Sequence, residues 1–160
     1  MGRQRHALCS ACLCAREVSG HEHDTPISKQ VGYLPENFIH NTIVHTGTPD
    51  NATTREWYEE LPADQRQNLW SYLKRASEES AEAAAPELIR LAWSSPAALA
   101  MAPFQDRLNL GSEGRMNLPG HADGNWRWRF TEEELSLAAF QWLQQLTETS
   151  NRLPAANRSA

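Results

Sequence analysis

Clear hydrophobic patterns begin at residue 42. The segment 42–47, TIVHTG, joins β-branched residues to a glycine, which predicts a short buried strand. Thr53 and Glu56 have the spacing of a capping box and predict a helix that ends at Pro62. Pro62 suits the first position of a second helix over 62–76, where apolar residues recur three and four apart.

The next stretch alternates again between helical and extended patterns. The Glu/Ala/Ser-rich segment 76–85 is compatible with a loop or a helix, since its composition favours helix but its apolar residues show little pattern. A helix with one apolar face is predicted over 86–95. The apolar run over 97–106 predicts a buried strand, and Gln105 and Asp106 place polar side chains at its carboxyl end.

The last third combines a long loop with a helix. The segment 111–130 is rich in Gly, Asn and Arg but includes bulky apolar residues, which indicates a structured loop rather than a linker. Thr131 and Glu134 repeat the capping-box spacing and predict an amphipathic helix over 131–149. The alternation of strands and helices predicts an α/β fold with parallel strands. Because two parallel strands need further neighbours, we expect a portion of a larger fold.

Composition narrows the classes of partner. The 160 residues suit a single domain and carry a net charge of -5, without the basic surface that nucleic acid requires. No apolar run approaches the roughly 20 residues that cross a bilayer, and the first residues lack the apolar core of a secretory signal. We therefore expect a cytoplasmic protein that binds neither nucleic acid nor membrane.

The first residues raise the question of zinc. Six potential ligands occur there: His6, Cys9, Cys12, Cys14, His21 and His23. The Cys-x2-Cys-x-Cys spacing has no matching second pair, as structural zinc sites usually have. We expect no metal site, and a zinc-binding module remains the alternative for this segment.

Four motifs resemble the C-terminal part of the amylomaltases, which are the 4-α-glucanotransferases of glycoside hydrolase family 77. The motifs are YLPENF (33–38), TGTPDNATTREWYEELP (46–62), RLAWSSPAALAMAPFQDRLNLGSEGRMNLPG (90–120) and GNWRWRF (124–130). The resemblance implies the last two β/α units of a (β/α)8 TIM barrel, incomplete in this chain. We accordingly divide the chain into an unmatched tail (1–30), part of a catalytic barrel (31–150) and a frayed tail (151–160).

The resemblance also implies a reaction. Family members transfer a segment of an α-1,4-glucan, such as maltodextrin, starch or glycogen, to glucose or another glucan with retention of configuration, and they need no cofactor. Such a transfer uses a carboxylate nucleophile and a carboxylic acid beside the anomeric carbon. A third carboxylate can bind sugar hydroxyls as positive charge develops on the ring. In the family motif GTHDN the aspartate has this third role, and its counterpart here is Asp50.

The candidate substrate-binding residues lie within these motifs, and each has a structural alternative. They are Asn51, Gln105, Asp106, Asn117 and Trp126. Asp50 could instead shape a turn or cap a helix. Gln105 and Asp106 could be held by backbone amides at a strand end. Ser112, Glu113, Arg115 and Asn117 could stiffen their loop, and Trp126 could pack as a lid.

Three departures from the family pattern bear on activity. Pro49 replaces the histidine before the aspartate and offers neither a side-chain donor nor a backbone N–H. Ala52 removes a polar group from the same turn. Nothing before residue 33 matches the strands that carry the nucleophile and the acid/base, so we expect no transfer by this chain alone. The alternative is a non-catalytic remnant with at most weak glucan binding.

Overall fold

The computed structural model describes residues 14–17, 35–75, 80–135 and 137–153. The chain divides into two compact units, residues 1–128 and 129–160. The first unit carries a three-stranded sheet with helices, and the second carries a single long helix.

The sheet has β2 (Thr42–His45) at its centre. β2 pairs in parallel with β3 (Leu99–Met101), with Val44 opposite Ala100. The prediction of two parallel strands is confirmed. β2 also pairs antiparallel with β1 (Cys14–Glu17), which lies in the segment we expected to be a tail. No sequence pattern indicated β1.

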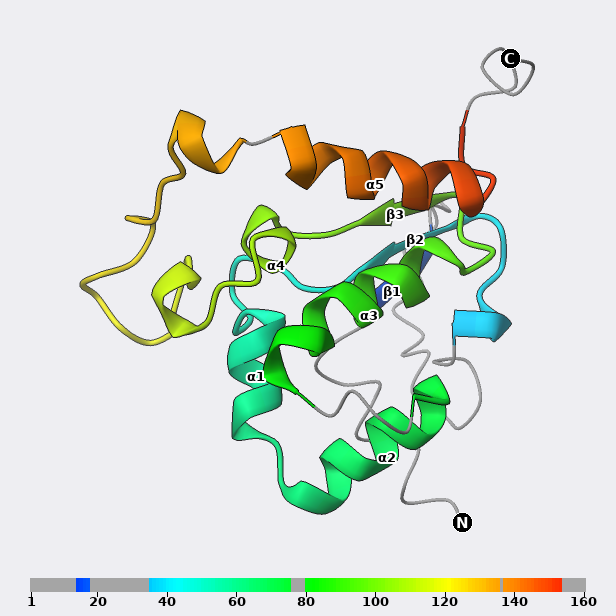
Figure 1. The fold of residues 1–160 in the computed structure, drawn as a ribbon. Coiled ribbons are helices and arrows are strands. Elements are labelled where there is room, and N and C mark those ends of the chain that lie inside the picture. The colour runs from blue at the N-terminus through cyan, green and yellow to red at the C-terminus, as the bar shows by residue number, and fades with distance from the viewer. Residues whose placement is uncertain (1–13, 18–34, 76–79, 136, 154–160) are drawn as a thin grey trace. The chain divides into compact units, whose positions relative to one another are not determined.

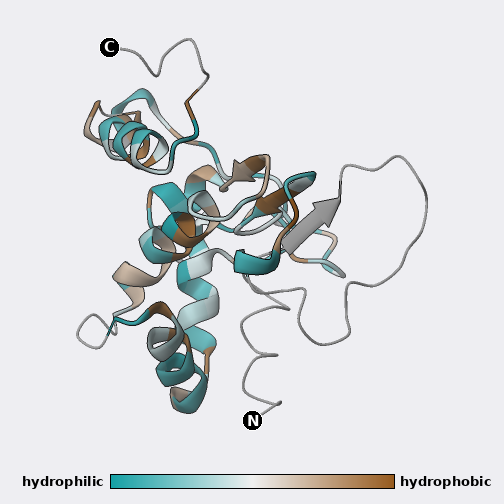
Figure 2. Cartoon of the chain, turned by 90° about the vertical axis from the view of Figure 1, so that its right-hand side faces the viewer, coloured by the Kyte–Doolittle hydropathy of each residue, from teal (hydrophilic) through white to brown (hydrophobic). Residues whose placement is uncertain are grey.

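Three helices connect β2 to β3. They are α1 (Thr54–Glu60), α2 (Ala63–Leu73) and α3 (Ala81–Trp93), and a 3-10 turn, η1 (Pro35–Asn37), precedes β2. α3 contacts both α1 and β3 and lies across the sheet (Figure 1). Figure 2 shows brown hydrophobic and teal hydrophilic positions along the helices, and α3 is amphipathic. The order strand, helices, parallel strand is a β–α–β connection.

The core of the first unit joins α1 to α2 and α3. Trp70 Nε1 donates a hydrogen bond of 2.8 Å to Tyr58 Oη, and the two rings meet edge to face. Both side chains are buried, so this contact satisfies the polar atoms that their burial would otherwise leave unpaired. The fully buried positions of α3 include Leu88 and Ile89.

α3 begins five residues before the helix predicted over 86–95. Residues 81–85, for which the sequence allowed either a loop or a helix, are therefore helical. Its N-cap is Ser80, whose side chain accepts a hydrogen bond from the Ala83 N–H. Pro86 lies inside the helix and has no N–H for the carbonyl of Glu82, four residues earlier. That carbonyl instead accepts a hydrogen bond of 3.0 Å from Asn109 Nδ2. The contact explains how the helix extends back past the proline.

The strand predicted over 97–106 was too long. β3 holds three residues, and Pro103 precedes a short helix, α4 (Phe104–Arg107), that contains Gln105 and Asp106. Proline cannot continue the ladder of backbone hydrogen bonds, which limits the strand. The strand is also not buried, because Leu99 and Met101 are 48% and 52% exposed.

The second unit contains the predicted C-terminal helix, but with a later start. The Thr131–Glu134 capping box is present and closes a 3-10 turn, η3 (Glu132–Glu134), while α5 runs over Leu137–Thr149. The prediction of a helix from residue 131 was therefore wrong by six residues at its start. None of the helices in the described part of the chain has both the length and the apolar character to span a bilayer.

Candidate functional site

Asp50 lies in an exposed turn after the carboxyl end of β2. The Asn51 N–H donates to the Thr48 carbonyl at 3.0 Å. The Asn51 side-chain oxygen accepts from both the N–H and the hydroxyl of Thr48, at 2.9 and 2.7 Å. Asn51 thus closes the turn that presents Asp50, and Pro49 stiffens the same turn by fixing its own φ.

Asn117 meets Asp50 from the long loop predicted over 111–130. Its Nδ2 donates a hydrogen bond of 2.6 Å to Asp50 Oδ1. The two residues are 67 positions apart in the chain, so the folded loop brings them together. The long loop itself is confirmed, with one short 3-10 turn, η2 (Ser112–Gly114). The structure therefore brings Asp50, the expected transition-state stabiliser, into contact with Asn117, one of the candidate substrate-binding residues.

Arg115 ties this loop to the start of α1. Its Nη1 lies 3.2 Å from Glu56 Oε1, and its Nε donates to the Asn117 carbonyl at 3.2 Å. Glu56 also donates its N–H to the Thr53 hydroxyl, the N-cap of α1. The expected cap is present, but the Glu56 carboxylate pairs with Arg115. Arg115 therefore links the backbone of Asn117, the residue that binds Asp50, to α1.

Glu113 closes the beginning of the same loop. Its Oε1 accepts a hydrogen bond of 2.8 Å from the Gly111 N–H. Hydrogen bonds from its own backbone and then from Gly111 hold the pKa of Glu113 below its ordinary value. Thr53 Oγ1 donates to the Gly111 carbonyl, which links this end of the loop to α1 as well. The turn contacts of the alternative loop network are present, but the ion pair of Arg115 is with Glu56 of α1 rather than with a residue of the loop.

Trp126 returns the loop toward Asn117. The backbone N–H of Trp126 donates a hydrogen bond of 2.6 Å to the backbone carbonyl of Met116, which is the residue before Asn117. Asn125 fixes the return by accepting from the Leu118 N–H and donating to the His121 carbonyl, each at 2.8 Å. Trp126 has a left-handed φ of 61° and remains 51% exposed. An exposed indole can stack on a sugar face.

Asp106 takes a different position. It is 2% exposed, and its carboxylate accepts hydrogen bonds from the Thr46 hydroxyl, the Thr54 N–H and the Thr54 hydroxyl at 2.7–2.8 Å. Its neighbour Gln105 is also buried. The geometry favours the alternative in which the pair is held by the protein. Asp106 joins the ends of β2 and α1, the two elements on either side of the Asp50 turn.

The partners of Asp106 and Arg115 were missed by sequence reasoning. Thr46, Thr54 and Glu56 read locally as strand or helix-start residues, and only the fold shows their contacts across more than fifty positions. A buried acidic residue needs hydrogen-bond partners. The apolar run before Asp106 was the one sequence signal that Asp106 could be buried and would need them.

The candidate zinc ligands fall almost wholly outside the described residues. Cys14 belongs to β1, and the other cysteines and the tail histidines precede or follow it in undescribed segments. Within the described ranges, no three His, Cys, Asp or Glu side chains are arranged to hold a metal ion.

Sequence comparison identifies related proteins. The family model of 4-alpha-glucanotransferase matches residues 9–136, which begins upstream of Tyr33. The 4-alpha-glucanotransferase of Synechocystis sp. is 45% identical over 121 residues, 75% of this chain and 23% of that protein. The enzyme of Aquifex aeolicus is 44% identical over 105 residues, 66% of this chain and 21% of that protein.

A solved structure has the same fold. Amylomaltase from Streptococcus agalactiae in complex with acarbose superposes with a TM-score of 0.69 and 27% identity. The match covers 79% of this chain and 25% of that one. The chain thus spans about a quarter of the length of the proteins it matches.

Proposed function

The chain belongs to the 4-alpha-glucanotransferase family, and from this premise we propose that it supplies the C-terminal part of a glucanotransferase active site. The reaction is the retaining transfer of an α-1,4-glucan segment to glucose or another α-glucan. The observation that carries the proposal is the hydrogen bond between Asp50, in the exposed turn that follows a parallel strand, and Asn117 of the long loop.

In the proposal β2 and β3 are the last two strands of a (β/α)8 barrel. Their parallel pairing and the helices between them support this, as does the match to amylomaltase over a quarter of that chain. Active sites of such barrels lie at the carboxyl ends of the strands, which is where the Asp50 turn follows β2. The remaining strands, the nucleophile and the acid/base belong to the parts of family members that this chain does not match.

Asp50 is the transition-state stabiliser of the proposed site. Its exposed carboxylate can accept hydrogen bonds from sugar hydroxyls, which strengthen as the ring gains positive charge. Asn117 orients the carboxylate and offers its remaining hydrogen-bonding atoms to the same sugar. Trp126 supplies an apolar surface on the loop that carries Asn117.

Asn51, Gln105 and Asp106 support this arrangement. Asn51 uses its side-chain oxygen to close the Asp50 turn. Asp106 fixes the ends of β2 and α1 by its threonine contacts, and Gln105 lies under Gly114 at the base of the loop. Burial leaves Asp106 little surface for a glucan, so its role in the proposal is to position the turn.

The acarbose in the Streptococcus agalactiae complex suggests the kind of ligand to test. We propose α-1,4-glucans such as maltodextrins, starch or glycogen as donors, with glucose or a glucan as acceptor. The proposed setting is maltodextrin and glycogen metabolism in the cytoplasm. The proposed chemistry uses carboxylates and requires no cofactor.

A chimera tests the proposal directly. Residues 33–149 of this chain replace the matching segment of the Synechocystis relative, and glucose release from maltotriose is measured. The proposal expects transfer by the chimera and a 10²–10³-fold loss of kcat, on the order found for one transition-state donor, after Asp50→Ala. Transfer that survives Asp50→Ala unchanged would refute the assignment.

The second candidate function is glucan binding without transfer, and Pro49 favours it. Proline removes both a side-chain donor and an N–H next to Asp50. In the same chimera, Pro49→His should raise kcat if the turn has retained its catalytic geometry. A chimera that binds acarbose but stays inactive with Pro49→His would support the remnant instead.

A further inference from the structure

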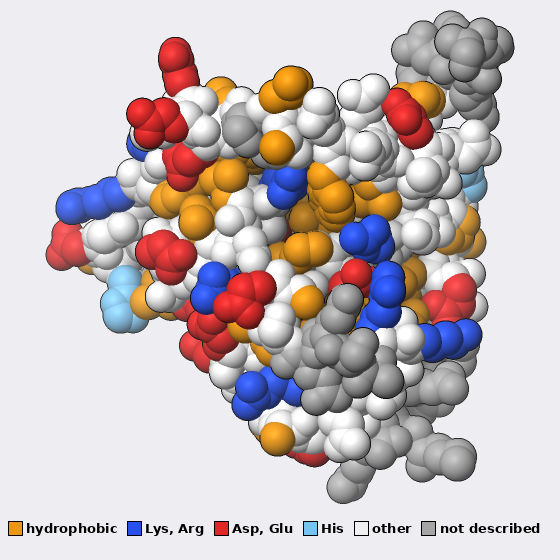
Figure 3. Space-filling model, in the orientation of Figure 1, with side chains coloured by type: hydrophobic (Ala, Val, Ile, Leu, Met, Phe, Trp, Pro, Cys, Tyr) orange, Lys and Arg blue, Asp and Glu red, His pale blue; other side chains and the backbone are white. Residues whose placement is uncertain are grey.

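The segment 118–124, which we call the loop tip, is exposed at every residue. It belongs to the part of the long loop, yellow in Figure 1, that projects away from the sheet of the first unit. Figure 3 shows charged and histidine side chains at the same edge of the view. Loop tips are where proteins concentrate chemical and proteolytic change, because water reaches their backbone.

Asn125 closes the loop tip by contacts that fix the length of backbone within it. Its side-chain oxygen accepts from the Leu118 N–H, and its Nδ2 donates to the His121 carbonyl, each at 2.8 Å. Between His121 and Asn125 the chain passes through Asp123 and Gly124, and Gly124 has a left-handed φ of 86°. A change in the backbone at these two positions therefore acts on the Asn125 contacts.

The peptide bond between Asp123 and Gly124 is unprotected. Among the described residues, the Asp123 carboxylate and the Gly124 N–H have no hydrogen-bond or ion-pair partner. No side chain shields the Gly124 nitrogen, because glycine has no Cβ and a Cβ built there would meet nothing within 4 Å. The nitrogen of Gly124 is thus accessible to the carboxyl group beside it.

The other aspartates of the described chain, Asp50, Asp64 and Asp106, differ in this respect. In each case the next backbone N–H donates to a carbonyl, from Asn51 to Thr48, from Gln65 to Pro62 and from Arg107 to Pro103, at 3.0, 3.0 and 3.3 Å. The carboxylates of Asp50 and Asp106 also accept hydrogen bonds. The fold therefore holds the reactive groups at these three positions and leaves those at Asp123 unheld.

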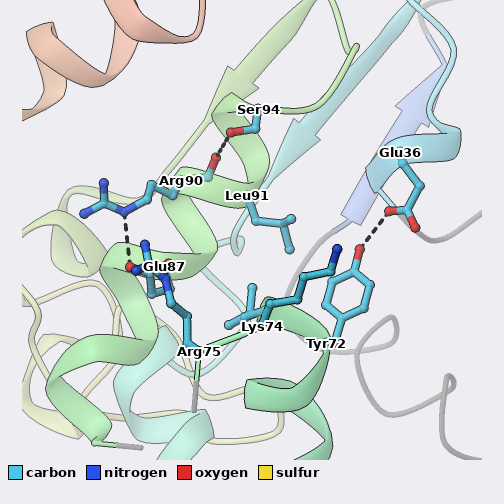
Figure 4. Close-up of a pocket in the computed structure, with 9 residues that line it drawn as sticks. Glu36, Tyr72, Lys74, Arg75, Glu87, Arg90, Leu91 and Ser94 are labelled. Atoms are coloured by element: carbon cyan, nitrogen blue, oxygen red, sulfur yellow. Dashed lines mark hydrogen bonds and ion pairs between the residues drawn. The ribbon is translucent and has the colours of Figure 1, made fainter. Parts of the chain in front are cut away.

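Acidic side chains around the pocket between α2, α3 and η1 are held as well (Figure 4). Glu87 pairs with Arg75 and Arg90, and Glu36 accepts a hydrogen bond from Tyr72. These residues are glutamates, whose longer side chain would have to close a six-membered ring on the next backbone nitrogen. Aspartate closes a five-membered ring, which forms more readily.

We propose that Asp123 is a site of spontaneous isomerisation to isoaspartate. The Gly124 nitrogen attacks Cγ of the protonated Asp123 carboxyl group. The N–Cγ bond forms, the Cγ–OH bond breaks, and the hydroxyl group leaves as water with the proton of the N–H. Water then opens the cyclic imide: cleavage of the N–Cγ bond restores aspartate, and cleavage at the backbone carbonyl carbon of Asp123 gives isoaspartate. Nothing is oxidised, and the mass of the chain is unchanged.

Isomerisation reroutes the backbone of the loop tip. In isoaspartate the main chain runs through Cβ and Cγ, which adds one atom to the path between His121 and Asn125 and leaves a carboxylate on Cα. The longer path displaces the Asn125 side chain from the His121 carbonyl, which it binds at 2.8 Å in the unmodified chain. The change lies in the loop that carries Asn117 and Trp126, but the proposal holds whether or not this loop binds a glucan.

Prolonged incubation of the full chain tests the proposal. One sample stays folded at neutral pH and another is unfolded in guanidinium chloride, and isoaspartate is located by peptide mapping and mass spectrometry. A protease that cleaves before aspartate but not before isoaspartate identifies the position. In the folded sample isoaspartate should accumulate at Asp123 and not at Asp50, Asp64 or Asp106, and Asp123 should react at a similar rate in both samples. The proposal is overturned if folded Asp123 is as stable as Asp64, or if folding strongly slows its isomerisation.

Two variants test the chemistry and its effect on the loop. Gly124→Asn keeps a residue that tolerates left-handed backbone but adds a side chain beside the nitrogen, so isomerisation should slow severalfold. Asp123→Glu should abolish it. In 15N NMR of the unaltered chain, a second Asn125 side-chain amide signal should grow in step with isoaspartate, and none should appear in Asp123→Glu. An unchanged rate in folded Gly124→Asn, or a single Asn125 signal while isoaspartate accumulates, would overturn the proposal.

Discussion

Asn117 Nδ2 lies 2.6 Å from Asp50 Oδ1 and joins the loop after α4 to the turn after β2. Neither residue is buried, so this contact does not serve the core. Arg115 donates to the carbonyl of Asn117 and pairs with the carboxylate of Glu56, so the loop is fixed to α1 close to Asn117. An exposed carboxylate with a fixed donor beside it is suited to recognise hydroxyl groups.

Removal of the Asn117 side-chain amide should weaken glucan binding and leave the free energy of unfolding almost unchanged. Asn117→Ala deletes a hydrogen bond to a charged acceptor, and we expect acarbose binding to weaken about tenfold. The free energy of unfolding should change by less than about 1 kcal/mol, because the pair is exposed. Calorimetric titration and urea unfolding of the same preparations measure both quantities. If Asn117→Ala lowers the free energy of unfolding but leaves acarbose binding unchanged, the recognition role of Asn117 is contradicted.

Asp106 and Asp50 should give opposite results. Asp106→Ala leaves the Thr54 N–H and two threonine hydroxyls buried without their acceptor, and should cost about 3 kcal/mol or more in urea unfolding. Asp50→Ala, the exposed control, should change stability by about 0.5 kcal/mol at most. Equal stability losses in the two variants would refute the division between a supporting and a recognising carboxylate.

Gly114 sits where the loop meets α4. A Cβ there would lie 2.8 Å from Leu110 Cβ and 3.3 Å from Gln105 Cγ. Gly114→Ala should therefore destabilise the chain by about 1–3 kcal/mol and displace the loop that carries Asn117. Gly47→Ala is the matched control, since its Cβ would meet only Pro103 Cγ at an ordinary 3.6 Å. Thermal unfolding that ranks the two variants in reverse would contradict the packing of the loop.

His45 makes the sheet sensitive to acid. Burial lowers the pKa of His45 below 6.5, outweighing the hydrogen bond with the Gly47 backbone. The unfolded chain therefore takes up a proton first as pH falls below about 6.5, and the free energy of unfolding declines until the folded pKa is reached. The slope from this residue cannot exceed about 1.4 kcal/mol per pH unit.

The His45→Gln substitution measures that contribution. Urea unfolding between neutral pH and mildly acidic pH should show a shallower decline in stability for His45→Gln than for the unaltered chain. His121→Gln, in the exposed loop, serves as the control and should leave the slope unchanged. A decline of the same steepness in His45→Gln would show that the acid sensitivity arises elsewhere.

Local patterns predicted those features of the fold that local interactions determine. The Thr53 cap, the β2 strand and its parallel pairing with a later strand all followed from spacing and alternation. The start of α3 did not, because Pro86 lies inside the helix and the Glu82 carbonyl that it leaves without a donor binds Asn109, 27 residues after Glu82. The strand β1 carries no pattern that distinguishes it from the surrounding polar segment.

For the candidate site, too, the sequence indicated some residues but could not indicate the contacts that depend on the fold. Family resemblance pointed to Asp50 and the loop sequence to Asn117, and the fold brings them into contact. The end of the predicted strand pointed to Asp106, whose burial and threonine partners depend on how β2 and α1 converge. The sequence around Asp106 cannot reveal that convergence, because the threonines that bind it lie more than fifty residues earlier.

The central claim is that the Asp50 turn faces a glucan, and 15N NMR of the chain with acarbose tests it most directly. The account predicts saturable shifts of the Asn117 side-chain amide and the Trp126 indole N–H, with binding weakened about tenfold in Asp50→Asn. If these signals stay fixed while acarbose binds elsewhere, or if Asp50→Asn binds equally well, the account is contradicted.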